Sequence, residues 1–314
     1  MQRYVLGFLA VSTAFAAGAG YEVSGKVLPK SWAFVTLYST DTPYATNTVV
    51  VPGTNFHFKN LEAGSYALVI FVRGRGQARR TVLVGPGTAD RHGRISLQLN
   101  LQDSDFVPGQ AAAVHMVSTK ELSIPDAAWR DYRDALKSLT KHDAVTATKR
   151  LEDAVERAPQ FSAAWNNLGT IAYQTGNYAR AEECFREALA QDPSSYEALV
   201  NLGGVLVTLH KLAEALDRNS LAATMRPHDA LAQSQLGLTY FLLGRLDLAK
   251  KHLVLACDVD PAHFTHPQLT LAEIDIRQGD RHAAADILDN FLAHHPDWPQ
   301  AARMRQTIAE LRSD

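Results

Sequence analysis

The hydrophobic positions follow two different periods in the two parts of the chain. Near residue 97, apolar and polar side chains alternate, which indicates a strand with one buried face. The segment 66–72 is apolar on both faces, as expected of a central strand. Segments of this kind, separated by turn residues, predict strands at 21–28, 33–38, 46–51, 55–58, 66–72, 79–84 and 94–101. Short strands at near-regular spacing predict a β-sandwich over residues 20–101.

From residue 127 onward the apolar period becomes three and four residues, which is typical of helices. Prolines recur every 34 residues, with one interval of 35, at Pro159, Pro193, Pro227, Pro261 and Pro296. An interior proline ends a helix, because it removes a donor and clashes with the preceding turn. The spacing therefore predicts five helix–turn–helix units and a cap helix, at 128–161, 162–195, 196–229, 230–263, 265–298 and 299–314.

Two sets of equivalent residues, one residue from each unit, support this division. We call such a set a column. Small residues recur where paired helices must approach closely, at Ala135, Gly169, Gly203, Gly237 and Ala272. The first helix of each unit ends at His142, Gly176, His210, Gly244 or Gly279. This position predicts a left-handed backbone, which glycine adopts at little cost and histidine adopts less readily.

The second unit, residues 162–195, fits a known pattern most fully. It resembles the tetratricopeptide repeat family at Trp165, Leu168, Gly169, Gly176, Tyr178, Ala181, Phe185, Ala188 and Pro193. The resemblance covers residues 128–298 and implies a solenoid whose first helices line a groove for peptides or partner helices. The groove residues that it implies include Asn166, Asn167, Thr170, Tyr173, Asn201, Val207, Gln235, Leu238 and Phe241. The amides among them can hydrogen-bond a ligand backbone, although asparagine is equally common there for structural reasons.

The front domain resembles the carboxypeptidase regulatory-like, prealbumin-like sandwich. The segments Val23-Ser-Gly-Lys-Val27 and 54–66 carry this resemblance, which implies a non-catalytic module. Residues 102–126 form a connector. The expected fold class is α+β multidomain: an N-terminal antiparallel β-sandwich followed by an α-helical solenoid.

The charge is distributed unevenly. The net charge is −2, with 46% hydrophobic and 20% charged residues, which argues against a dedicated nucleic-acid binder. Residues 20–105 carry a net +3 and residues 106–314 a net −6. Two solvated surfaces are the simpler interpretation. Attraction between the halves, or binding of an anionic polymer by the front, is the alternative.

Residues 1–19 predict a cleaved signal peptide, since Arg3 precedes a short apolar run and a small-x-small site. We therefore expect a secreted or periplasmic protein without a membrane span in the mature chain. The two cysteines, Cys184 and Cys257, lie two units apart, which is too far for a disulfide.

Motifs for catalysis are absent from the sequence: there is no phosphate loop, nucleophile elbow or zinc-protease helix. We expect no cofactor and no metal, since His263 and His266 lack an obvious third ligand. A cluster at Arg73, Arg75, Arg79 and Arg80 could bind anions, or could serve solubility.

The sequence thus favours an exported, non-enzymatic scaffold that binds a protein segment of unknown identity in the solenoid groove. A glycan- or cell-wall-binding module acting through the sandwich is the alternative. An enzyme with an unrecognised site has the least support.

Overall fold

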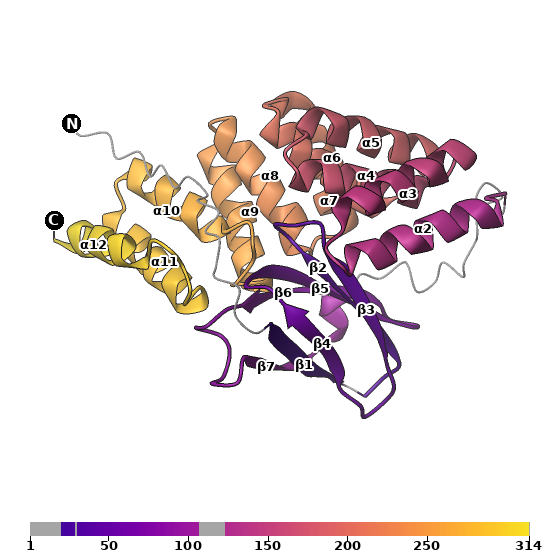
Figure 1. Cartoon of the computed structure of the whole chain (residues 1–314). Helices are drawn as coiled ribbons and strands as arrows, with labels where there is room; N and C mark the ends of the chain where they lie inside the picture. The colour runs from indigo at the N-terminus through magenta and orange to yellow at the C-terminus, as the bar shows by residue number, and fades with distance from the viewer. Residues whose placement is uncertain (1–19, 29, 107–122, 314) are drawn as a thin grey trace.

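The computed structural model describes residues 20–28, 30–106 and 123–313, and it has two parts (Figure 1). Two β-sheets come first, and a solenoid of paired helices follows. This confirms the predicted fold class. The predicted signal peptide, residues 1–19, and most of the predicted connector, residues 107–122, lie outside the described residues.

The N-terminal part is built from seven strands in two sheets. The strands are β1 (Tyr21–Leu28), β2 (Ala33–Ser39), β3 (Ala45–Val50), β4 (Phe56–Leu61), β5 (Gly64–Val72), β6 (Gly76–Val84) and β7 (Arg94–Asn100). One sheet has the order β4-β1-β7 and the other has the order β3-β2-β5-β6. The pairs are antiparallel except for β1 and β7, which run parallel. A short 3-10 helix, η1 (Asp103–Asp105), follows β7.

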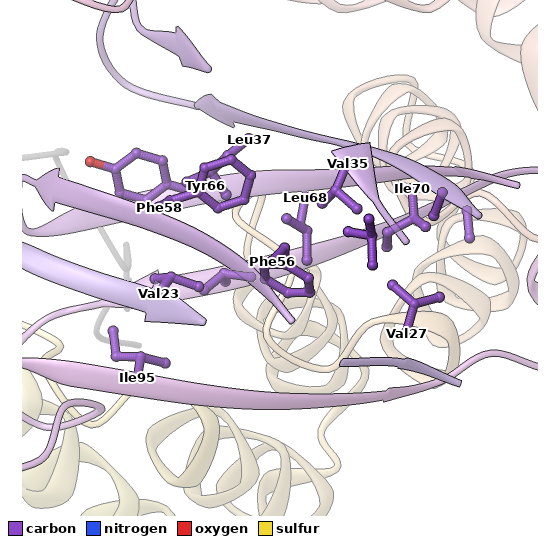
Figure 2. Close-up of a cluster of buried hydrophobic side chains, with 14 of the residues drawn as sticks. Val23, Val27, Val35, Leu37, Phe56, Phe58, Tyr66, Leu68, Ile70 and Ile95 are labelled. Carbon is purple, nitrogen blue, oxygen red and sulfur yellow. The ribbon is translucent and has the colours of Figure 1, made fainter. Parts of the chain in front are cut away.

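The core of this part lies between the two sheets, where the buried side chains of alternate residues meet (Figure 2). Val23, Phe56 and Ile95 come from the three-stranded sheet, and Leu37 and Leu68 come from the four-stranded sheet. Along β5 every second residue is buried and the intervening ones are half-buried. The outer face of the four-stranded sheet is therefore partly covered as well.

The helical part contains five antiparallel helix pairs and a final helix among the described residues. The helices are α2 (Asp126–Leu139), α3 (Ala144–Arg157), α4 (Ser162–Gln174), α5 (Tyr178–Gln191), α6 (Tyr196–Thr208), α7 (Leu212–Met225), α8 (Ala230–Leu242), α9 (Leu246–Val259), α10 (Pro267–Gln278), α11 (Arg281–His294) and α12 (Ala301–Arg312). The even-numbered helices α2 to α10 are the first helices of the pairs. Each pair exposes an apolar face that is buried only by stacking on its neighbours.

The turns and crossings of the pairs follow the two columns read from the sequence. The turn position is left-handed in all five pairs, with φ between 55° and 87° at His142, Gly176, His210, Gly244 and Gly279. At the crossings, a Cβ on Gly169 would lie 2.6 Å from Phe185, and one on Gly237 would lie 2.6 Å from Leu253. Paired helices therefore approach as closely as the small residues predict.

The extra residue of the single 35-residue interval falls in the connector between α9 and α10. This connector spans residues 260–266, whereas the one between α7 and α8 spans residues 226–229. His266 takes up the change with a left-handed backbone, φ 52°, directly before Pro267 starts α10. The two cysteines are free, and burial raises the pKa of Cys184 to about 11 and that of Cys257 to about 12.

Candidate functional site

The sandwich lies against the side of the solenoid that the first helices line (Figure 1). The sheets sit beneath the array, with α2 towards one end and α10 to α12 towards the other. The four-stranded sheet makes the contact, mainly through its edge strand β6 and the loop that follows it. The candidate site therefore includes an interface between the two parts as well as the groove itself.

Arg79 on β6 is the centre of this interface. Its Nη2 lies 2.7 Å from Glu197 Oε2 on α6, and its Nη1 lies 3.7 Å from Asp229 Oδ2 at the start of α8. Glu197 also lies 3.2 Å from Arg226 and accepts a hydrogen bond from Gln77 at 3.4 Å. Burial lowers the pKa of Arg79, but the two carboxylates more than reverse this and raise it overall. Two arginines and two carboxylates thus form a charge-balanced cluster.

Two further carboxylates hold the main chain of the same edge. Asp260, which follows α9, accepts a hydrogen bond from the Thr81 amide at 2.9 Å. Burial raises the pKa of Asp260, against the lowering effect of the hydrogen bonds from Thr81. Asp297, which follows α11, accepts from the Gly87 amide at 2.8 Å and 3.0 Å. A Cβ on Gly87 would meet Asp297 Oδ1 at 2.8 Å, so this approach requires glycine.

The opposite side of the sheet touches the first two helix pairs. The Gln174 amide at the end of α4 donates to the Ser39 carbonyl at 2.9 Å. The ring of Tyr44, just before β3, stacks on His142 in the turn of the first pair, with centroids 4.5 Å apart. Ala45 of β3 also packs against the hydrophobic core of the first helix pairs.

The predicted amide residues lie between neighbouring first helices. Asn167 donates to the Tyr132 hydroxyl at 3.2 Å, and Asn201 donates to Asn166 at 3.0 Å. Gln235 lies against Gly204, where an added Cβ would come within 2.6 Å of its Nε2. The amides thus connect adjacent units. Their role in binding a ligand stays a prediction.

The other predicted groove residues vary in exposure. Tyr173 is 39% exposed, and its hydroxyl lies 3.4 Å from the Thr208 hydroxyl. Val207 is buried, whereas Thr170 and Leu238 are half-buried. Phe241 lies under the guanidinium of Arg277, 4.6 Å from the ring centre. An accessible strip therefore crosses the C-terminal ends of α4, α6 and α8, and it includes Leu242, which is 39% exposed.

Three of the four arginines predicted as an anion site have carboxylate partners within the chain. Arg75 pairs with Asp103 at 2.8 Å, and its guanidinium lies over the Phe106 ring. Arg80 pairs with Asp105 at 2.5 Å, and Arg79 is in the interface cluster. Arg73 is exposed. Anion binding by these residues stays a prediction, but the cations do not form one open patch.

Three histidines gather where α9, α10 and α11 meet. Burial lowers the pKa of His263 and of His266 to about 3, so both rings are neutral at physiological pH. His266 packs against His295, with ring centroids 4.9 Å apart. Within the described ranges, no group of three or more possible ligands is placed to hold a metal ion.

Sequence reasoning did not find the interface residues Glu197, Asp229, Asp260 and Asp297. Glu197, Asp229 and Asp297 have no acidic residue at the equivalent position of another unit, and Asp260 has only Asp192, so no column marks them. The opposite net charges of the two halves were the available signal, and Arg79 is where that attraction acts. The sequence also gave no sign of the contact that Gly85 and Gly87 make with Asp297, which both approach closely.

The helical part is similar to known repeat proteins. A family model described as the Cilia and flagella-associated protein 70 middle TPR-like domain matches residues 140–257. The human cell division cycle protein 16 homolog is 27% identical over 179 residues, covering 54% of this chain and 29% of the relative. Human tetratricopeptide repeat protein 5 is 27% identical over 195 residues, covering 55% of this chain and 44% of the relative. The aligned regions thus span less than half the length of either relative.

Solved structures agree in fold. MamA from Desulfovibrio magneticus RS-1, residues 41 to the end, has a TM-score of 0.51 at 21% identity, covering 56% of this chain and 99% of that one. PilW, described as a widely conserved type IV pilus biogenesis factor, has a TM-score of 0.51 at 22% identity, covering 60% and 92%. Along the described residues, no helix combines the length and apolar character needed to cross a bilayer. The helical part of this chain therefore has the fold of a tetratricopeptide-like helical solenoid, against one side of which a two-sheet domain is docked.

Proposed function

We propose that the protein is a non-enzymatic scaffold that binds a segment of another protein in the part of the groove that its own sandwich leaves open. The observation that carries this proposal is the accessible strip at the C-terminal ends of the first helices. Tyr173 and Leu242 are each 39% exposed there, beside Thr208 and Phe241. Exposed apolar side chains that adjoin polar ones are typical of sites that bind proteins.

The docked sandwich defines the groove that a partner meets. At α6 and α8 it contacts the N-terminal ends, through Glu197 and Asp229, so the C-terminal ends remain accessible. In this proposal the sandwich is a carboxypeptidase regulatory-like module without catalytic activity, and it forms one wall of the binding region. The protein is exported, as the first 19 residues suggest. N-terminal sequencing of the mature protein tests the export.

The groove is tested by cross-linking and affinity capture from native envelopes with the double variant Tyr173→Lys and Leu242→Lys. Both side chains are accessible, so we expect the variant to fold and to lose its cross-linked partners. The matched control is Val145→Lys with Leu221→Lys, on the second helices α3 and α7, where the side chains are 83% and 47% exposed. Equal capture by both double variants would contradict the groove proposal.

A second candidate function is binding of a glycan or cell-wall polymer by the sandwich. Trp32 and Phe34 favour it, because each is 60% exposed on the same domain. Aromatic rings can stack on the apolar faces of sugars, and both the rings and the sugars keep their polar edges hydrated. Co-sedimentation of the full-length protein with purified cell-wall polymer tests this candidate. Unchanged sedimentation after Trp32→Ala with Phe34→Ala would argue against it.

A further inference from the structure

Four carboxylates of the solenoid contact β6 and the loop after it. We call Glu197, Asp229, Asp260 and Asp297 the acidic row. Three of them lie at successive junctions between units: Asp229 before α8, Asp260 after α9 and Asp297 after α11. Along the edge strand the contacts advance in the same order, from Arg79 through Thr81 to Gly87. The row therefore follows β6, which is extended, and the turn after it.

The groups that β6 offers to the row are available in any extended peptide that contains an arginine. They are one guanidinium and the main-chain amide of Thr81, whereas the Gly87 amide belongs to the turn after β6. β6 pairs with β5 along its other edge, so these contacts do not depend on the rest of the sheet. Guanidinium groups match carboxylates in geometry as well as charge, because both are planar and can form two parallel hydrogen bonds.

The interface also contains polar atoms that β6 leaves without partners. A cavity of about 20 Å³ is lined by Arg79, Asp229, Asp260 and His263, among others. Arg79 Nε and His263 Nε2 are buried and have no hydrogen-bond partner among the described residues, and His263 is only 1% exposed. His263 Nδ1 lies 2.7 Å from the Thr265 hydroxyl and 3.3 Å from the Thr265 amide, so Nε2 is the ring nitrogen that has no partner among the described residues. Two polar atoms without partners, Arg79 Nε and His263 Nε2, thus belong to residues that line a space of about the size of a water molecule.

We propose that the acidic row is a recognition site for an extended protein segment that carries an arginine, and that β6 is the resident occupant. This rests on the proposed scaffold function, and it names the chemistry of a partner: an arginine beside a polar group, in an extended main chain. Such a segment keeps the charge of the cluster balanced when it replaces Arg79, because Glu197 and Asp229 then still face Arg226 and one new guanidinium. A polar group in the segment can also reach His263 Nε2, which has no partner among the described residues when β6 is in place.

The test uses the full-length protein and a fluorescein-labelled synthetic peptide with the sequence of residues 76–88. The receptor is the variant Arg79→Ala, which removes the resident guanidinium and leaves the acidic row unchanged. By fluorescence anisotropy, we expect this variant to bind the peptide at least about tenfold more tightly than the unmodified protein does, corresponding to about 1.4 kcal/mol. The same peptide with Arg79→Ala should bind at least about tenfold more weakly, and adding Glu197→Gln to the receptor should have a similar effect.

Two results would overturn the proposal: no peptide binding to a folded Arg79→Ala protein, or equal binding of both peptides. If Arg79→Ala does not fold, as judged by circular dichroism, the receptor becomes Gly87→Ala, which loosens the end of β6 and keeps the acidic row. The same order of affinities is then expected, and its absence would count against the proposal. The groove variant Tyr173→Lys with Leu242→Lys should bind the peptide normally. Peptide binding with unaffected partner capture by that variant would refute the groove function alone.

Discussion

The four-stranded sheet has two edge strands, β6 and β3, which are in contrasting environments. β6 is polar on its outer face and is held by carboxylates of the solenoid. β3 carries Val49, which is 54% exposed and lies directly opposite Phe34 on β2, which is 60% exposed. One edge is therefore covered by the chain itself, and the other presents an apolar surface.

The contrast between β6 and β3 shows that the chain covers one edge strand of the sheet with its own carboxylates. An uncovered edge strand offers unpaired main-chain groups to any other strand, and proteins commonly cover or charge such edges. The acidic row does this for β6, since Asp260 and Asp297 accept from its main chain or from the loop that follows. The β3 side is held by a stacked pair of rings, one hydrogen bond and the packing of Ala45 against the first helix pairs. The ion pairs of the docking are therefore on the β6 side.

The largest effect is expected from Arg79→Glu. It places a carboxylate beside Glu197 and Asp229, whose side chains are 39% and 6% exposed. Breaking a buried ion pair and leaving like charges together should lower the free energy of unfolding by at least about 3 kcal/mol. Denaturant titration followed by circular dichroism measures the loss. The control Arg73→Glu, exposed in the turn between β5 and β6, should stay within about 0.5 kcal/mol. Equal losses would show that the docking does not depend on the cluster.

The second-largest effect is expected at low pH. There the protein should lose stability through His263, which lies behind β6. Its pKa of about 3 in the folded protein lies below the unfolded value near 6.5, so unfolding takes up a proton between these pH values. The contribution of His263 to the free energy of unfolding is therefore complete above pH 6.5. It falls as the pH is lowered, by about 2 kcal/mol at pH 5. Asp260 acts in the opposite sense, because its raised pKa favours the folded state at low pH.

This pH dependence is measured by repeating denaturant titrations from pH 7.5 to pH 4.5. The variant His263→Gln should show a flatter profile between pH 6.5 and pH 5. The exposed neighbour His228, replaced by glutamine, is the matched control and should leave the slope unchanged. A profile that is identical in all three proteins would contradict the assignment of the slope to His263.

Gly87→Ala tests the far end of the docked edge. The new Cβ would lie 2.8 Å from Asp297 Oδ1 and 2.9 Å from Pro296 Cβ, so the loop or the connector must move. Overpacking of this kind should cost about 1–2 kcal/mol. Gly64→Ala is the control, because its Cβ would meet only Asp41, at 3.8 Å. Thermal denaturation compares the two, and an equal shift in both variants would argue against a tight contact at Gly87.

The parts of this structure that repeat could be predicted from the sequence, and the parts that occur once could not. Five helix pairs and their left-handed turns follow from columns in which each residue type recurs, so the pattern accumulates over the units. The contact of Arg79 with Glu197 joins residues 118 apart and has no second copy. The predicted groove residues lie on the first helices, but the sequence did not reveal that Asn166 and Asn201 bond to each other, since a repeated position does not show how its side chains are oriented.

The smallest effect is expected on the β3 side, from His142→Gly compared with His210→Gly. Both histidines have a left-handed backbone, φ 57° and 55°, and glycine relieves this strain. His210→Gly should therefore stabilise the protein by about 0.5 kcal/mol, after the entropy of the more flexible unfolded chain is subtracted. His142→Gly also loses the stack on Tyr44, which is worth about 1 kcal/mol, so its net effect should be a loss of about 0.5 kcal/mol. Denaturant titration of both variants measures this difference. If His142→Gly stabilised the protein as much as His210→Gly, the ring stack would contribute nothing to docking.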